Sequence, residues 1–237
     1  MMISGERLQV VGHRGWRTRY PDNTLLGIEA CVGVADMVEI DIRRTADGRL
    51  VLSHDPELVG RVVSECDWSQ LADLDVGEGH PPVLLDDVLS ALPDLPLNLE
   101  VKNDPAEPGF EDDHRLGLDA AARARPGDLL TSFWWPTVDA VRRMFPHVET
   151  GLLAEPSTDL DPLLGHAVEE RHVAVVPHWS MLDAAPEFIA EAHRRGLRVV
   201  AWTVNDPAVA VRLAEAGLDA IITDDPGLMA ETLGGSR

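Results

Sequence analysis

The segment Leu97-Asn98-Leu99-Glu100-Val101-Lys102 is short, apolar and rich in β-forming residues, and it predicts a buried strand. Side chains alternate along a strand, so Glu100 and Lys102 point to the same side. Lys102 is the one lysine of a chain that also contains nineteen arginines. A buried ammonium needs a partner, and its compact charge differs from the planar fork of arginine. The pattern indicates a functional lysine at this strand end, although chance survival of one lysine explains it equally well.

Seven further runs of this kind alternate with helical stretches along the chain. The expected strands are Leu8–Val11, Met37–Ile42, Leu97–Val101, Leu129–Thr131, Gly151–Leu153, Ala174–Val176, Arg198–Val204 and Ala220–Ile222. The expected helices lie near Asn23–Val34, Leu85–Leu92, His114–Arg125, Thr137–Phe145, Asp161–Glu170, Pro186–Arg195, Pro207–Ala216 and Pro226–Leu233. Helix-start signals stand at Asn23, Asp206 and Asp225, and stop signals stand at Gly196 and Gly217.

Eight strands alternating with eight helices predict an α/β fold, a (β/α)₈ TIM barrel, as a single domain over residues 1–237. A doubly wound open sheet is the second possibility, but no GxGxxG motif follows the first strand. The stretch from Thr45 to Pro82 interrupts the alternation. We therefore expect a short insertion after the second strand.

The composition limits the classes of partner. A formal net charge of −21 argues against binding to nucleic acid or to anionic lipid headgroups. The sequence contains no run of eighteen apolar residues, so we expect no stable membrane insertion. Met1–Gly12 lacks the apolar core of a signal peptide. These features predict a cytoplasmic protein. Cys31 and Cys66 form neither a disulfide framework nor a metal cage, and nothing indicates the oligomeric state.

Charged side chains gather at the ends of the first three strands, where a TIM barrel carries its chemistry. These ends read Gly12-His13-Arg14-Gly15, Glu39-Ile40-Asp41 and Glu100-Val101-Lys102. Glu39 and Asp41 are two residues apart and share a face, and Glu100 on a neighbouring strand can join them. Three carboxylates without a nearby cysteine predict a site for one divalent cation, Mg²⁺ or Ca²⁺. The alternative is a salt-bridge cluster with Arg14 or Arg43.

The Asp47-Gly48 pair predicts a hairpin that returns the chain to these acids. A two-residue loop would pair Ala46 with Arg49 and place Asp41 opposite His54. A three-residue loop would shift the register by one residue and still bring His54 close. The hairpin therefore adds a histidine to the predicted cation site.

His13 and His54 are the candidate catalytic residues. A lone histidine is more often structural, but two beside acids and a lysine at one barrel mouth favour an acid–base pair. The other seven histidines are interpreted as structural, with His178 the one that could line the mouth. Trp202 lies in an expected strand that approaches the mouth, so it could form an apolar wall for substrate. Core packing is the simpler interpretation for at least one of the adjacent Trp134 and Trp135.

The chain resembles the glycerophosphodiester phosphodiesterase family in the order and spacing of many short motifs. These motifs are His13-Arg14-Gly15, Pro21-Asp22-Asn23-Thr24, Glu39-Ile40-Asp41, Thr45-Ala46-Asp47-Gly48, His54-Asp55, Glu100-Val101-Lys102, Trp202-Thr203-Val204-Asn205 and Ile222-Thr223-Asp224-Asp225-Pro226. The family often has Pro-Glu-Asn where this chain has Pro21-Asp22-Asn23, and the stretch after His54 is short compared with many members. Because that stretch helps to shape the leaving-group side, the preferred alcohol stays open.

The resemblance implies an enzyme with a TIM barrel and a divalent cation. It implies that Glu39, Asp41 and Glu100 hold the metal. It further implies that His13 and His54 share the acid–base work and that Arg14 and Lys102 hold the phosphate of a small phosphodiester. The expected reaction is hydrolysis of a glycerophosphodiester to sn-glycerol 3-phosphate and an alcohol.

Three other functions stay open. A lysophospholipase D would use the same scaffold on an acylated substrate. Another metal-dependent barrel enzyme, such as a sugar-phosphate lyase or isomerase, would be inactive on every diester. A barrel that binds phosphorylated ligands without turnover would not need two histidines.

Overall fold

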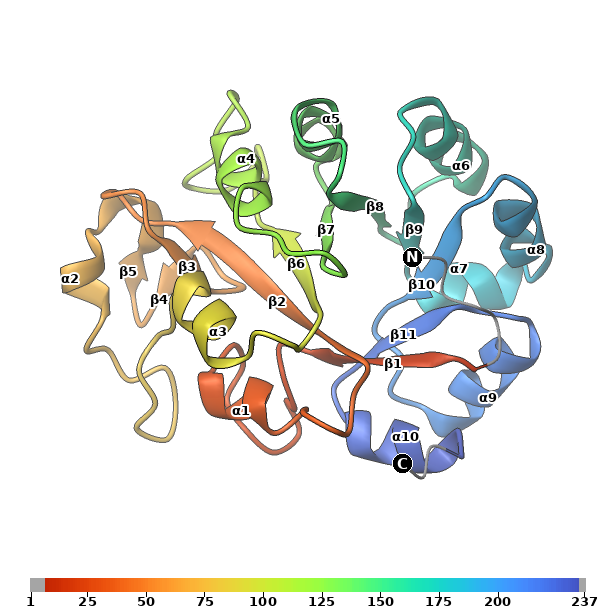
Figure 1. The fold of residues 1–237 in the computed structure, drawn as a ribbon, viewed down its shortest axis with the longest axis horizontal. Helices are drawn as coiled ribbons and strands as arrows, with labels where there is room; N and C mark the ends of the chain where they lie inside the picture. Colours follow the sequence, from red (N-terminus) through yellow and green to blue (C-terminus); the bar gives the residue numbers. More distant parts are fainter. Residues whose placement is uncertain (1–6, 235–237) are drawn as a thin grey trace.

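The computed structural model describes residues 7–234, which form a closed barrel of eight parallel strands (Figure 1). The barrel strands are β1 (Gln9–His13), β2 (Met37–Arg44), β6 (Leu97–Val101), β7 (Leu129–Ser132), β8 (Glu149–Ala154), β9 (Ala174–Pro177), β10 (Arg198–Ala201) and β11 (Ala220–Thr223). Each strand pairs with the next in this order, and β1 pairs with both β2 and β11. This double pairing closes the ring and excludes the open sheet.

Helices surround the strands, as the periphery of Figure 1 shows. They are α1 (Leu25–Glu29), α3 (Leu85–Ala91), α4 (Arg115–Ala121), α5 (Trp135–Met144), α6 (Leu160–Glu169), α7 (Trp179–Ala184), α8 (Glu187–Arg194), α9 (Pro207–Glu215) and α10 (Pro226–Thr232). Every barrel strand is followed by at least one of these helices, and β9 is followed by two, α7 and α8. The predicted (β/α)₈ TIM barrel is confirmed. The expectation for Met1–Gly12 falls partly on residues 1–6, outside the described residues.

Several predicted boundaries need correction. Helix α1 begins two residues after the predicted start, because Asn23 has a φ of 57° and Thr24 caps the helix by accepting a hydrogen bond from the Gly27 N–H. It ends at Glu29, with Ala30 as its C-cap, and so stops before the predicted end at Val34. The predicted strand Arg198–Val204 ends at Ala201, and Trp202 makes only an isolated bridge with His178. The short helix α7 was not predicted. The predicted starts at Asp206 and Asp225 are correct, since both side chains accept hydrogen bonds from their helices.

The insertion after β2 begins with a hairpin. Strand β3 (Leu50–Leu52) pairs antiparallel with β2, with Ile42 opposite Leu52 and Arg44 opposite Leu50. The Thr45 N–H donates to the Arg49 carbonyl across a three-residue loop, so the two-residue register is wrong. In the observed register the Ser53 N–H donates to the Asp41 carbonyl. His54 therefore follows directly after the residue opposite Asp41.

The rest of the insertion consists of short elements at one side of the barrel (Figure 1). They are β4 (Glu57–Leu58), β5 (Arg61–Val62), the 3₁₀ helix η1 (Val63–Glu65) and α2 (Trp68–Leu71). Val63 and Leu71 from these elements pack with Val51 and Leu84 in a small apolar cluster of their own. This cluster anchors the insertion against β3, the strand that leads into His54.

Alternation along the strands divides the side chains between two cores. Val38, Ile40 and Ile42 of β2 join the large core between the strands and the helices, whereas Glu39 and Asp41 point into the barrel. Inside the barrel lies a separate apolar cluster made of Val11, Leu153, Val176, Val200, Ala220 and Ile222, with Met37 of β2 packed against it. The acids therefore share the barrel interior with a cluster of low polarity.

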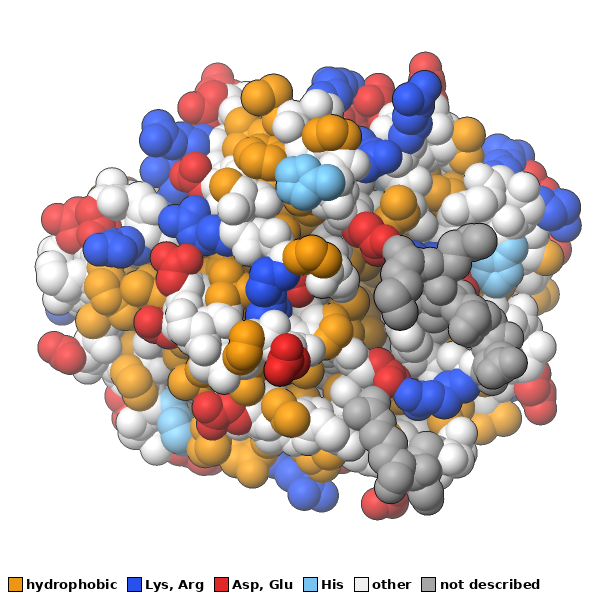
Figure 2. Space-filling view, viewed as in Figure 1, with side chains coloured by type: hydrophobic (Ala, Val, Ile, Leu, Met, Phe, Trp, Pro, Cys, Tyr) orange, Lys and Arg blue, Asp and Glu red, His pale blue; other side chains and the backbone are white. Residues whose placement is uncertain are grey.

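The outer surface is mixed in character. On the face shown in Figure 2, acidic, basic and apolar side chains are interspersed, so the acidic composition does not form one continuous field on that face. Within residues 7–234, no helix has the length and apolarity that crossing a bilayer requires.

Candidate active site

Three buried carboxylates converge inside the barrel. Asp41 lies opposite Glu100 in the parallel pairing of β2 with β6, and Glu39 lies two residues before Asp41 on the same face. One oxygen from each of the three side chains lies within 4.8 Å of the others. All three residues are at least nine-tenths buried. Their charges therefore need compensation from nearby cations.

Two positively charged side chains, Lys102 and Arg14, supply part of this compensation. The Lys102 Nζ atom lies 3.0 Å from Asp41 Oδ1 and also forms an ion pair with Glu100. The Arg14 Nε atom lies 3.1 Å from Asp41 Oδ2. Burial alone would raise the pKa of Asp41, but Lys102, Arg14 and a hydrogen bond from Asn23 together lower it to about 2. The same acids raise the pKa of Lys102 despite its burial.

Glu39 is the carboxylate that these cations leave incompletely balanced. Its Oε2 accepts a hydrogen bond of 2.9 Å from the Arg14 N–H, whereas its buried Oε1 has no hydrogen-bond partner among the described residues. Burial, reinforced by Asp41 and Glu100, raises the pKa of Glu39 well above its usual value. Within residues 7–234, Asp41 Oδ1 also lacks a hydrogen-bond partner, although it lies near Lys102. A set of oxygen donors with such atoms fits a hard divalent cation. Glu39, Asp41 and Glu100 are the residues that could hold it.

The turn after β1 brings Arg14 over the acids. Arg14 has a φ of 55°, an uncommon backbone conformation for a residue with a side chain. Gly15 has a φ of 93°, and a Cβ there would lie 2.7 Å from the Gly27 carbonyl carbon. Beyond its contact with Asp41, Arg14 donates from Nη1 to Asp22 at 3.0 Å. The turn therefore depends on close contact with α1 and fixes the guanidinium at the barrel mouth.

His13 is held by an acid from the last barrel strand. Its Nδ1 lies 2.6 Å from Asp224 Oδ1, and Asp224 Oδ2 accepts a hydrogen bond of 2.6 Å from Asn205. Although burial opposes it, hydrogen bonds from His13 and Asn205, with the charges of His13 and Arg17, lower the pKa of Asp224 to about 2. An ionised Asp224 accepts the Nδ1–H of His13. This leaves Nε2, 4.0 Å from Glu39, turned toward the acids.

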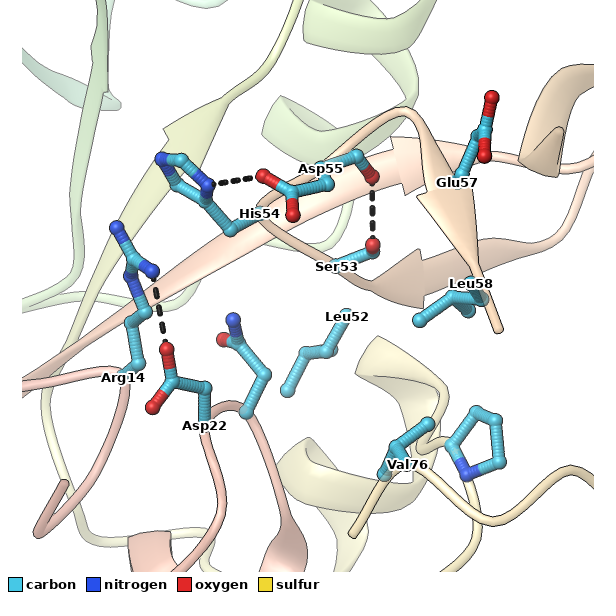
Figure 3. Close-up of a pocket in the computed structure, with 11 residues that line it drawn as sticks. Arg14, Asp22, Leu52, Ser53, His54, Asp55, Glu57, Leu58 and Val76 are labelled. Carbon is cyan, nitrogen blue, oxygen red and sulfur yellow. Dashed lines mark hydrogen bonds and ion pairs between the residues drawn. The ribbon is translucent and has the colours of Figure 1, made fainter. Parts of the chain in front are cut away.

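His54 approaches from the insertion, as Figure 3 shows. Its Nδ1 lies 2.7 Å from Asp55 Oδ1, and its backbone carbonyl accepts hydrogen bonds from Arg43 Nε and Nη2 at 3.0 and 2.6 Å. Arg43 in turn forms an ion pair of 2.6 Å with Glu107. The side chain of His54 is 41% exposed and that of His13 only 12%, so the two imidazoles meet different environments.

Three adjoining hollows meet at His54. One, of about 190 Å³, lies between Arg14 and the insertion (Figure 3). The second, of about 90 Å³, is lined by His13, Arg14, Glu39, Glu100, Lys102 and Trp202 among others. The third, also of about 90 Å³, extends toward Glu107, Trp134 and Glu155. All three include His54 in their walls. The predicted site residues thus line one connected region, apart from Asp41, which lies beneath it.

The tryptophans divide between wall and core. Trp202 donates from Nε1 to the Val176 carbonyl at 2.9 Å and packs edge-to-face against Phe133 at 5.2 Å. Trp134 also lines a hollow, whereas Trp135 packs against the core and donates to the Leu153 carbonyl. His178 packs edge-to-face against Trp202 at 5.1 Å and lines none of the hollows around His54.

Sequence reasoning overlooked three residues that position the site. Asn23 donates from Nδ2 to Asp41 Oδ2 at 2.9 Å and accepts from the Asp41 N–H, and Asp224 and Asn205 hold His13. The available signal was the place of Asp224, which follows the last strand and so lies beside the first strand once the barrel closes. Asn23 was interpreted as a helix-start signal and as part of a family motif, without a role at the site.

Comparisons with known proteins agree with this geometry. The family model described as the glycerophosphoryl diester phosphodiesterase family matches residues 13–228. A glycerophosphodiester phosphodiesterase from Caldanaerobacter subterraneus is 28% identical over 239 residues, which cover 92% of this chain and 94% of that protein.

Two solved structures share the fold. A glycerophosphodiester phosphodiesterase from Parabacteroides distasonis has a TM-score of 0.83 at 23% identity and covers 98% of each chain. A phosphodiesterase from Oleispira antarctica, solved in complex with the product sn-glycerol-3-phosphate, has a TM-score of 0.83 at 21% identity, over 96% of this chain and 97% of that one. The match of the family model over most of the sequence decides the assignment: this chain belongs to the glycerophosphoryl diester phosphodiesterase family and is a phosphoric diester hydrolase.

Proposed function

We propose that this enzyme uses one divalent cation, Mg²⁺ or Ca²⁺, to hydrolyse a glycerophosphodiester to sn-glycerol 3-phosphate and an alcohol. The observation that carries the proposal is the unpartnered Oε1 of Glu39 within a buried group of three carboxylates, beside a hollow lined by His13 and His54. A group of this kind can bind a cation that offsets the negative charge of a phosphodiester. We further propose that the whole chain acts as one catalytic domain.

The metal ligands in this proposal are Glu39, Asp41 and Glu100. When bound, the cation supplies Lewis-acid chemistry to a phosphoryl oxygen. Lys102 contacts both Asp41 and Glu100, so these two ligands would share their oxygens between the lysine and the cation. Binding requires the ionised form of Glu39, because carboxylate ligands must be ionised.

Arg14 and Lys102 bind the phosphate in the proposed complex. Arg14 offers a planar fork suited to two phosphate oxygens, and Lys102 offers a compact charge where negative charge grows. Both side chains line the same hollow as His13 and His54. Trp202 and Phe133 form the apolar wall on the other side, where the carbon atoms of glycerol can pack.

His13 acts as the base and His54 as the acid for the leaving group. His13 Nε2 takes the proton of the glycerol hydroxyl next to the phosphate, while the hydroxyl oxygen forms a bond to phosphorus. The bond from phosphorus to the alcohol breaks, and His54 donates a proton to the departing oxygen. Asp224 supports the first role by fixing the His13 tautomer, and the greater exposure of His54 supports the second, since the alcohol must leave toward solvent.

Water then opens the resulting cyclic phosphate with the roles reversed. His54 takes a proton from the attacking water, and His13 returns its proton to the glycerol oxygen as the ring opens. Each histidine ends in the protonation state in which it began. The proton count therefore closes over the two steps.

Product formation tests the proposal directly. Purified protein is incubated with glycerophosphocholine, glycerophosphoethanolamine or a lysophospholipid, together with Mg²⁺ or Ca²⁺, with and without a chelator. We expect release of sn-glycerol 3-phosphate that stops when the chelator is present and resumes when the cation is restored. Activity confined to the lysophospholipid would identify a lysophospholipase D instead. Failure to cleave any diester with either cation would refute the proposed reaction.

A further inference from the structure

A second group of metal-binding side chains lies outside the active site. Asp139 on α5, His166 on α6 and His172 in the connection from α6 to β9 place their ligand atoms within 4.8 Å of one another. Asp139 and His172 are buried, whereas the His166 side chain is 32% exposed. None of the three lines the hollows around His54. The group therefore has no part in the reaction described above.

Both imidazoles direct the same nitrogen at one carboxylate. His172 Nε2 lies 3.0 Å from Asp139 Oδ1, and His166 Nε2 lies 3.1 and 3.2 Å from Asp139 Oδ1 and Oδ2. Other histidine–acid contacts within residues 7–234, such as His193 with Asp219, involve a single imidazole. The two rings are nearly parallel, with an interplanar angle of 20° and centroids 6.2 Å apart.

Neighbouring side chains hold both rings in this orientation. Thr150 Oγ1 on β8 lies 2.8 Å from His172 Nδ1, inside the protein. A hydroxyl there can accept the Nδ1–H and leave Nε2 free to bind a metal, as the outer partners of metal-ligating histidines do. The ring of Trp135 packs against His166 at 5.3 Å with an angle of 32°. The orientation of the donors is therefore built into the fold.

The donor set matches a different cation from that of the active site. Two imidazole nitrogens and one carboxylate oxygen suit Zn²⁺ and related transition metals, whereas Mg²⁺ and Ca²⁺ prefer oxygen alone. Tetrahedral ligands at the usual zinc distances lie about 3.3 Å apart. The two imidazole nitrogens lie 3.0 and 3.1 Å from Asp139 Oδ1, and all three donor atoms lie within 4.8 Å of one another. Three protein ligands leave a fourth position, which water can fill from the exposed side of His166.

We propose that Asp139, His166 and His172 form a binding site for a Zn²⁺-class transition-metal ion, which ties α5 and α6 to the start of β9. One oxygen of Asp139 and the Nε2 atoms of both histidines are the ligands, and Thr150 orients His172. The proposal is independent of the reaction proposed for the active site.

Zinc binding by the full chain tests this site. Metal-stripped protein is titrated with Zn²⁺ by calorimetry, and the number of ions bound per chain is compared between variants. The double variant Glu39→Gln, Asp41→Asn disables the acidic site and should keep one zinc equivalent. The variant His166→Ala should bind one zinc ion fewer per chain than wild type. The variant Thr150→Val should lower the zinc affinity of this site by about 10–100-fold. His147→Ala, at an exposed position outside both sites, is the matched control.

Folding is checked separately by circular dichroism and thermal melting. His166→Ala keeps the buried contact between His172 and Asp139, so we expect the variant to fold. Bound Co²⁺ gives a second measurement, because its visible absorption bands report nitrogen ligation and should disappear in His166→Ala. The proposal would be refuted if His166→Ala bound as much zinc as wild type, or if the folded acidic-site double variant bound no zinc. Either result would show that the three residues form only a structural hydrogen-bond cluster.

Discussion

His13 at the end of the first barrel strand contacts Asp224, the residue directly after the last strand, although the two are 211 residues apart in sequence. Their side chains are 2.6 Å apart. The contact joins His13 Nδ1 to an acid that Asn205 and Arg17 also hold. Because Asp224 carries a negative charge, it orients the imidazole by accepting the Nδ1–H. This contact, made across the closing pair of strands, therefore orients the imidazole that we propose as the catalytic base.

Replacing Asp224 with asparagine should reduce catalysis without preventing folding. The asparagine side chain keeps the size of aspartate but loses its charge, and its amide can face His13 with a donor. We expect kcat to fall by about 10²–10⁴-fold, in the range usual for general acid–base groups. Steady-state kinetics on glycerophosphocholine, with a thermal melt of each protein, measures the effect. The control is Asp219→Asn, which removes an acid from an exposed histidine outside the site. Equal rates for wild type and Asp224→Asn would contradict a role in orienting the base.

Removing either imidazole should have a similar effect on turnover. His13→Ala and His54→Ala should each lower kcat by about 10²–10⁴-fold. The turnover of the two variants should depend differently on the leaving group, because an alcohol of low pKa, such as p-nitrophenol, departs without a proton. We therefore expect such a substrate to rescue His54→Ala but not His13→Ala, as release of p-nitrophenol would measure. His147→Ala serves as the exposed control. Rescue of His13→Ala instead would show that His13 is the acid for the leaving group and His54 the base.

Acid stability should depend on Asp224. Its pKa falls from 3.8 to about 2 in the folded protein because the contacts with His13 and Asn205 outweigh burial. A group whose pKa is lowered on folding stabilises the protein above its unfolded pKa and loses this contribution as pH falls through the folded value. Urea unfolding between about pH 5 and pH 2 should therefore show a shallower loss of stability in Asp224→Asn than in wild type. If the free energy of unfolding varied with pH in the same way in both proteins, Asp224 would have the same pKa in the folded and unfolded states.

Local patterns were sufficient to predict the barrel. The eight expected strands correspond to the eight barrel strands because each is a short buried run, such as Leu97–Val101, whose pattern needs no distant information. Helix ends were predicted where side chains cap them, as at Asp206. The first predicted helix was wrong at both ends, because Asn23 has a φ of 57° and Thr24 is the cap instead, and because the helix stops at Glu29. Strand positions are therefore more readily predicted here than helix lengths.

The site was predictable where neighbours in sequence or on adjacent strands determine it. Spacing along β2 brought Glu39 and Asp41 to one face, and strand order placed Glu100 beside Asp41. Of the two hairpin registers considered, the three-residue loop is observed, because the Thr45 hydroxyl accepts from the Arg49 N–H and stabilises the longer loop. Asp224 received no role because its partner is reached only when the barrel closes.

Gly15 offers a test of how tightly the turn beneath Arg14 is built. In Gly15→Ala the new Cβ would lie 2.7 Å from the Gly27 carbonyl carbon, at a φ of 93°. Gly33 also has a positive φ, of 77°, but a Cβ there would meet no atom within 4 Å. Gly33→Ala is therefore a matched control that has the conformational cost without the collision. We expect Gly33→Ala to lower the free energy of unfolding by about 1 kcal/mol and Gly15→Ala by about 2–4 kcal/mol.

Urea unfolding measures both free energies, and kinetics on the folded fraction measures the effect on the site. Because Gly15 follows Arg14, relief of the collision should displace the guanidinium from Asp41 and raise KM for the diester in Gly15→Ala alone. A free energy of unfolding equal in the two variants would mean that α1 yields to the added methyl group. In that case the position of Arg14 would not depend on the contact between Gly15 and Gly27.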